Sequence, residues 1–207
     1  ELFGHEKGAF TGAIETVLDT AVRDFASGEQ LTYLKASPTG SELCQISRGE
    51  EKRLLAAGLP VYSSAQIIPH DDKLAFVLLD GTLFAAANNK AASVAGDLSA
   101  AHWEPALQSL VLTRGREIWL YEPAGQSSTL IYKGTQNLGR VVYNAPTNNL
   151  FATEGRNIVA VEVDKVEKPN IYILTETQTA NVKFTLNAEG NRLYYLDGSN
   201  LTSLQIR

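Results

Sequence analysis

Few residues of this chain occur in patterns that attack a substrate or hold a metal ion. The sequence of 207 residues contains one cysteine, Cys44, and three histidines, His5, His70 and His102. Cys44 lies in a strand-like run, Ser41 to Ser47, where we expect a small buried side chain and not a reactive thiol. The ligand spacings of a zinc site are missing, and so is the Gly-x-Ser-x-Gly turn that exposes a nucleophilic serine. We therefore predict no metal and no cofactor.

Two carboxylates, Asp24 and Glu104, are the best candidates for acid/base chemistry. Each lies in a segment that we expect to form the innermost strand of a repeated sheet. The corresponding segments around Ile67, Val141 and Val182 carry no acid. Cleavage of a glycosidic bond needs two carboxyl groups at a defined separation, so a glycosidase-like five-bladed propeller is the enzymatic alternative. Because only two of five segments supply an acid, we favour a protein without catalytic activity.

The composition excludes several classes of partner. The net charge is −5 and the isoelectric point is about 5.3, which disfavours non-specific binding to nucleic acid or to anionic lipid. The sequence contains no run of 18 apolar residues, so we predict no membrane span. Because the sequence begins Glu1-Leu2-Phe3 without an initiator methionine, we expect a processed or excised piece that would have lost any targeting segment.

The elements that position these residues recur with a period of about forty residues. Each unit has a strand headed by leucine, then a polar turn and another apolar strand. The leucines are 43, 36, 40 and 43 residues apart, at Leu31, Leu74, Leu110, Leu150 and Leu193. The strands that follow centre on Leu43, Leu83, Ile118, Ile158 and Leu201. Turns such as Asp80-Gly81 are strong hairpin signals, and a repeat of this length is typical of a β-propeller.

Outer strands follow in four of the five units. They are expected at Lys52–Ala56, Ala91–Ala95, Ser128–Lys133 and Ile171–Thr175. The fifth unit has none, and we predict that the strand-like segment Ile14 to Leu18 supplies it and closes the ring. The predicted fold is therefore all-β, a β-propeller of about five four-stranded blades closed by an N-terminal strand. The alternative is that the chain is a fragment of a larger propeller.

Residues 14–207 resemble the TolB-like family of propellers. The best local matches are Asn187 to Asp197 and Pro69 to Val77, which carry the turn and apolar-strand pattern of that family's blades. Members of the family are usually extracytoplasmic protein-binding modules. The resemblance therefore implies an extracytoplasmic location and a protein partner.

The first thirteen residues are of a different kind. Glu1 to Ala13 is similar to the signature loop of the sigma-54 enhancer-binding AAA+ activators, whose GAFTGA core matches Gly8 to Ala13. The resemblance implies that Phe10 and Thr11 would contact the sigma-54 factor. The chain lacks the G-x-x-x-x-G-K-[ST] loop that binds ATP phosphates, so no ATPase accompanies the segment. We interpret residues 1–13 as a foreign or appended segment and residues 14–207 as the propeller domain.

The predicted function is a non-catalytic binding platform for a protein, peptide or glycan partner. The predicted ligand contacts are Trp103, Glu104 and Asp24 on inner strands, together with Tyr121 and Tyr195, which we expect to be exposed beside hairpins. The alternatives are the glycosidase-like propeller and sigma-54 contact through the GAFTGA segment.

Overall fold

The computed structural model describes residues 17–47, 51–163 and 169–206. These residues form nineteen β-strands and one 3₁₀ turn, η1 (Ala145–Thr147). The strands assemble into five antiparallel sheets, and each sheet follows the order of the chain. Within the described ranges no helix is long and apolar enough to cross a membrane.

Four sheets have four strands and the last has three. Blade 1 contains β1 (Val22–Ser27), β2 (Leu31–Ser37), β3 (Gly40–Ile46) and β4 (Lys52–Leu59). Blade 2 contains β5 (Ala65–Pro69), β6 (Leu74–Leu79), β7 (Thr82–Ala87) and β8 (Lys90–Ala95). Blade 3 contains β9 (Ala100–Glu104), β10 (Ser109–Arg114), β11 (Glu117–Glu122) and β12 (Ser127–Lys133). Blade 4 contains β13 (Leu138–Asn144), β14 (Asn149–Glu154), β15 (Asn157–Glu162) and β16 (Ile171–Glu176). Blade 5 contains β17 (Phe184–Leu186), β18 (Arg192–Asp197) and β19 (Asn200–Gln205).

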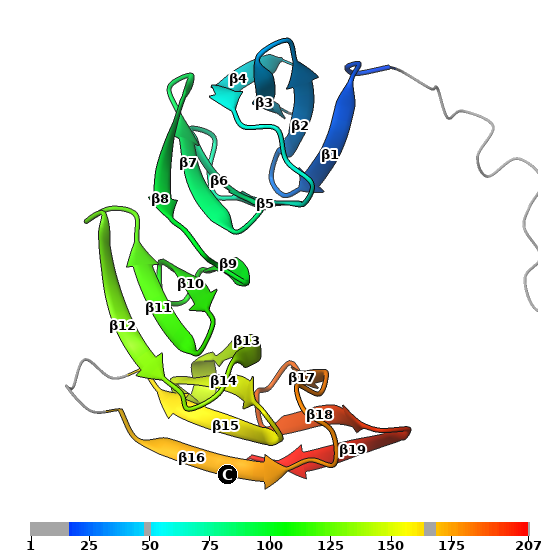
Figure 1. Ribbon diagram of the computed structural model, residues 1–207, viewed down its shortest axis with the longest axis vertical. Coiled ribbons are helices and arrows are strands. Elements are labelled where there is room, and N and C mark those ends of the chain that lie inside the picture. Colours follow the sequence, from blue (N-terminus) through cyan, green and yellow to red (C-terminus); the bar gives the residue numbers. More distant parts are fainter. Residues whose placement is uncertain (1–16, 48–50, 164–168, 207) are drawn as a thin grey trace, which may run out of the picture.

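The five blades follow one another around an arc, as in a β-propeller (Figure 1). The first strands β9 and β13 lie toward the concave side, and the fourth strands β8, β12 and β16 lie on the convex side. Blade 1, in blue, and blade 5, in red, lie at opposite ends of the arc. The chain is therefore an open propeller with two terminal blades.

The hydrophobic core lies between consecutive blades. Alternate residues of each strand point to opposite faces of its sheet, so a central strand with two apolar faces can pack against both neighbours. On β6, for example, Val77 packs with blade 1 whereas Phe76 packs with blade 3. Phe151 on β14 packs with blade 5, whereas its neighbour Leu150 packs with blade 3. Four such clusters join the five blades in sequence.

The predicted repeat is confirmed. Each of the five leucines lies at the first or second position of its blade's second strand, β2, β6, β10, β14 or β18. The predicted third strands correspond to β3, β7, β11, β15 and β19, and the predicted outer strands to β4, β8, β12 and β16. The inner strands with Asp24, Ile67, Glu104 and Val141 are β1, β5, β9 and β13. Val182 is buried just ahead of β17 and not within it.

The predicted closure of the ring is not confirmed. Of the segment Ile14 to Leu18, the structure describes Val17 and Leu18, and these two residues form no strand. Both instead line a cavity on blade 1, at the opposite end of the arc from β19. Blade 5 remains a three-stranded sheet in the described part of the chain. Packing of these apolar side chains on blade 1 replaces the strand pairing that the sequence suggested.

A repeated polar contact fixes the loop that leads into each of the last four blades. In three blades an acid at the end of the second strand, Asp80, Glu154 or Asp197, accepts hydrogen bonds from backbone N–H groups of that loop. The donors are Ser63 and Ser64, Thr135 and Gln136, and Gln178 and Thr179. Blade 3 reverses the charges, because Arg114 on the strand pairs with Asp97 in the loop at 2.9 Å. These contacts set the entry angle of each blade.

Glu154 makes the most complete of these contacts. Its side chain is only 6% exposed and accepts the Tyr132 hydroxyl at 2.6 Å, the Thr135 hydroxyl at 2.8 Å and the Gln136 N–H at 3.1 Å. Burial raises the pKa of the Glu154 carboxyl, but these hydrogen bonds outweigh burial and leave the pKa below its ordinary value. A side chain at Gly134 would collide with the carboxylate, since a Cβ there would lie 2.7 Å from Oε1.

Candidate functional site

The outward face of blade 1 is built like an internal interface of the propeller. On β2, Leu34 points into the core shared with blade 2, whereas Tyr33 points the other way, beside Cys44 and Ile46 of β3. This second cluster belongs to blade 1 alone, with Leu31 and Leu54 packed at its margin. We refer to this surface, formed by Phe25, Leu31, Tyr33, Cys44, Ile46 and Leu54, as the outward face of blade 1.

The same strand positions pack on a preceding blade elsewhere in the chain. Leu31 heads its strand as Leu110, Leu150 and Leu193 do in blades 3, 4 and 5. Those three leucines lie in the clusters that join their blades to the blade before. In the described part of the chain no blade precedes blade 1. The outward face is therefore a blade-packing surface without its neighbour.

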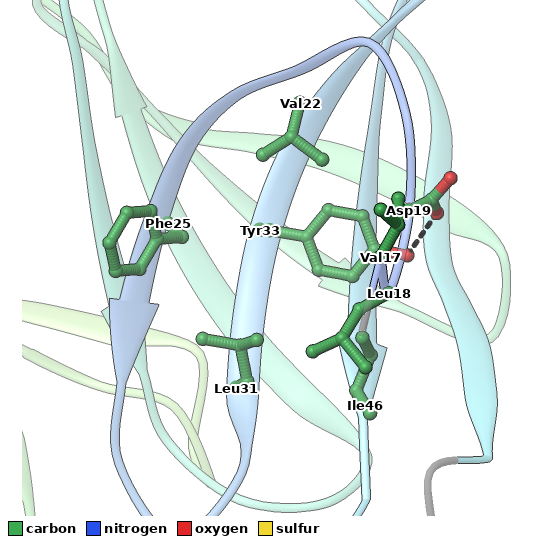
Figure 2. A pocket seen from close by; sticks show the side chains of 8 residues that line it. All are labelled: Val17, Leu18, Asp19, Val22, Phe25, Leu31, Tyr33 and Ile46. Atoms are coloured by element: carbon green, nitrogen blue, oxygen red, sulfur yellow. Dashed lines mark hydrogen bonds between the residues drawn. The ribbon is translucent and has the colours of Figure 1, made fainter. Parts of the chain in front are cut away.

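A cavity of about 330 Å³ lies on this face (Figure 2). Its lining residues are Val17, Leu18, Asp19, Val22, Phe25, Leu31, Tyr33 and Ile46. Figure 2 shows the chain from Val17 to Asp19 passing over Tyr33 and Ile46, with Phe25 across the opening on β1. Phe25 is 67% exposed and Val17 is 76% exposed, which is unusual for large apolar side chains grouped together. The site is an apolar hollow whose rim remains open to solvent.

One charged group lies at the edge of this cavity. The Asp19 carboxylate accepts the Tyr33 hydroxyl and lies 3.8 Å from the Lys35 ammonium and 3.9 Å from that of Lys52. The hydrogen bond from Tyr33 is the main cause that lowers the pKa of Asp19, while burial and that bond raise the pKa of Tyr33. Asp19 is therefore ionised and already paired. This balance favours an uncharged apolar occupant over a charged one.

Cys44 does not bring nucleophilic chemistry to this surface. The thiol is buried beneath the face beside Tyr33, and burial raises its pKa, which disfavours the reactive thiolate. Its environment agrees with the predicted role of a small core residue.

The structure does not bring the two predicted carboxylates together. Asp24 lies on β1 of blade 1 and Glu104 at the end of β9 in blade 3, so blade 2 separates them. The Asp24 carboxylate accepts the N–H of Phe25 at 2.8 Å, and Glu104 accepts that of Ala106 at 3.3 Å. These contacts are local turns of the chain. Their geometry offers no support for the glycosidase-like alternative, which needs convergent carboxylates.

The predicted aromatic contacts lie between blades. Trp103 is partly buried in the core of blades 2 and 3, with its ring centroid 4.1 Å from that of His70. Tyr121 and Tyr195 are each 9% exposed, which corrects the expectation that both are exposed. The ring of Tyr121 meets Phe76 edge-on, and Tyr195 lies in the core between blades 4 and 5. Both side chains fill the space between sheets, because the hairpins beside them do not lift them out of the blade faces. Phe10 and Thr11 lie outside the described residues.

Comparisons with known proteins place the fold but not a family. No family model matches the sequence, and no curated protein matches it. Among solved structures, Kuenenia stuttgartiensis hydrazine synthase is similar with a TM-score of 0.57 and 14% identity, over 86% of this chain. The structure of YCF48 bound to D1 peptide has a TM-score of 0.56 and 10% identity over 94% of this chain. PorZ, a bacterial surface component of the type-IX secretion system of Porphyromonas gingivalis, has a TM-score of 0.52 and 15% identity over 91%.

These neighbours support the propeller fold and leave the TolB-like and GAFTGA resemblances unconfirmed. The chain spans 62% of the hydrazine synthase chain, 68% of the YCF48 chain and 25% of the PorZ chain. The described blades therefore correspond to part of each neighbour's structure.

Proposed function

We propose that this chain is a non-catalytic binding module that takes an apolar segment of a protein or peptide on the outward face of blade 1. The observation that carries the proposal is the open cavity in which Phe25, Val22 and Leu31 surround the buried ring of Tyr33. Clustered apolar side chains at a concave surface are typical of sites where another protein docks. Covering one exposed phenylalanine contributes about 1.5–3 kcal/mol, so a few anchors suffice for a specific contact.

A protein or peptide suits the site better than a glycan. Glycan recognition needs many hydrogen-bonding groups, whereas Asp19 is the only charged side chain of the lining and is already paired with Tyr33. The printed description of one structural neighbour, YCF48, includes a bound peptide, which supports a propeller of this kind as a peptide-binding scaffold. That of PorZ describes a bacterial surface component, which supports an extracytoplasmic location. Sigma-54 contact through Phe10 and Thr11 remains a separate prediction, tested with a peptide of residues 1–13.

Replacing Phe25 by aspartate is expected to weaken peptide binding at least thirtyfold. Truncation of an aromatic anchor at an interface typically costs 2 kcal/mol or more, and the new carboxylate would add a desolvation cost. The measurement starts from peptides selected by display against the whole chain and compares the affinities of purified wild-type and variant proteins by calorimetry.

Leu130→Asp is the matched control for this experiment. Leu130 is another exposed apolar residue, but it lies on β12 of blade 3, far along the arc from the cavity. The proposal expects selected peptides to bind this variant as they bind the wild type. Peptides that bind Phe25→Asp normally, or that lose binding only in Leu130→Asp, would place the binding surface elsewhere.

A further inference from the structure

The second uncovered region of the arc is the edge of its last sheet. In blades 1 to 4 the third strand pairs on both sides, since a fourth strand runs antiparallel beside it. In blade 5 the third strand, β19, pairs only with β18 in the described part of the chain. Its other edge carries unpaired backbone groups, and Leu201 on this strand is 77% exposed.

The other outer strands are protected against pairing with a further strand, and β19 is not. Each of β4, β8, β12 and β16 has a register shift against its neighbour, and each contains at least one charged residue. Bulges and charges are the usual devices that keep an exposed sheet edge from joining another. The sequence of β19, Asn-Leu-Thr-Ser-Leu-Gln, has no charge and no proline, and its register with β18 is regular over six pairs. This edge has the character of an interior strand.

The hydrogen-bonding direction of each residue on this edge follows from the ladder. The N–H of Ile206 donates to the Asn191 carbonyl on the β18 side at 2.9 Å. Backbone groups of an antiparallel strand alternate in direction, so those of Leu204 and Thr202 also point to β18. The N–H and C=O groups of Leu201, Ser203 and Gln205 therefore point to the free edge.

We propose that β19 pairs antiparallel with β19 of a second copy of this chain, about a two-fold axis at Ser203. In this register Ser203 lies opposite its counterpart, and Leu201 lies opposite Gln205 of the second copy. All three residues present backbone donors and acceptors to the partner strand, which allows about six hydrogen bonds. The side chains also stay on matching faces, because pairs related by this axis are separated by an even number of residues. The product is a six-stranded sheet shared by two arcs.

A second copy fits the edge better than a charged peptide does. The edge offers no charged residue that could select a charged partner, whereas an identical uncharged strand meets every free donor with an acceptor. A two-fold contact also closes on itself, since each chain has one such edge and uses it once. The contact leaves the outward face of blade 1 free, so it is independent of the proposed peptide site.

Ser203→Pro is expected to convert the dimer into a monomer without unfolding the chain. Proline removes an N–H that faces the partner and leaves the N–H groups that bond to β18 in place. Ser203→Ala keeps the backbone donor and is the matched control. Sedimentation velocity or light scattering should give about twice the 22.5 kDa of one chain for the wild type and for Ser203→Ala, and one chain mass for Ser203→Pro. Circular dichroism checks that all three proteins are folded.

Amide hydrogen exchange gives a second readout that does not depend on the proline variant. The amides of Leu201 and Ser203 should become protected as the wild-type concentration rises, whereas that of Leu204 should be protected at all concentrations. A wild-type protein that stays monomeric up to its solubility limit would overturn the proposal. So would a dimer that persists in Ser203→Pro but dissociates in Phe25→Asp, because that dimer would use blade 1.

Discussion

Replacing Glu154 by alanine is expected to lower the free energy of unfolding by about 3–5 kcal/mol. The substitution removes the acceptor of the Tyr132 hydroxyl and of two backbone N–H groups in the loop that enters blade 4. Because these donors lie in a region that water reaches poorly, each would lose a charge-assisted hydrogen bond without replacement. For a chain of this size the loss corresponds to about 10 °C in melting temperature. Chemical denaturation followed by circular dichroism measures the effect.

The charge of Glu154 also predicts a dependence on pH. Its pKa is below the ordinary value in the folded protein, so the folded state favours the ionised carboxylate. The resulting stability is fully present above the ordinary pKa of glutamic acid, about 4.3, and is lost as the pH falls through the folded value. Glu154→Gln cannot ionise and should lack this part of the acid destabilisation. An identical decline of wild type and Glu154→Gln below pH 5 would contradict the assignment.

Replacing Phe151 by alanine is expected to cost about 3–5 kcal/mol and to release blade 5. Phe151 is fully buried between blades 4 and 5, where it meets Phe184 and Leu193. Blade 5 has a neighbour on one side only in the described structure, so this core is its main attachment to the arc. A cavity there should therefore raise hydrogen exchange of the β18 amides before those of blades 1 to 3.

Phe76→Ala is the matched control for this effect. Phe76 is equally buried, but it lies between blades 2 and 3 in the middle of the arc. Its truncation should cost a similar free energy and affect blades on both sides. If Phe151→Ala and Phe76→Ala produced the same exchange pattern, the blades would unfold as one unit and the separate release of blade 5 would be wrong.

Local patterns in the sequence were sufficient to predict the blades. Alternating apolar residues and Gly-containing turns specify short antiparallel hairpins, and the spacing of Leu31, Leu74 and their equivalents specifies one sheet after another. The acids at the ends of second strands were read only as turn residues. Their recurrence before glycine, as in Asp80-Gly81 and Glu154-Gly155, was a signal for the loop contacts that the structure shows.

The candidate site could not be predicted in the same way. Leu31 and Tyr33 have the same pattern as residues buried between blades, and only the three-dimensional arrangement shows that nothing precedes blade 1 in the described chain. Ring closure failed for a related reason. The curvature of the arc depends on how the side chains between sheets fill their wedge, and a hydrophobicity pattern does not encode that angle. Tyr121 and Tyr195 are buried by the same packing.

The most direct test of the account is the distance between the two ends of the arc. Thr39 and Ser199 lie in equivalent exposed turns of blades 1 and 5, and Arg156 lies in the equivalent turn of blade 4. Spin labels on cysteines introduced in pairs would report the Thr39–Ser199 and Arg156–Ser199 distances by pulsed electron resonance, in the Ser203→Pro background so that both labels share one chain. Cys44 is buried and can remain.

An open arc predicts a Thr39–Ser199 distance much longer than the Arg156–Ser199 distance, which spans adjacent blades. A closed ring would make the two distances alike, because packed sheets lie only about 10 Å apart. That result would cover the outward face of blade 1 with blade 5 and remove the proposed binding site.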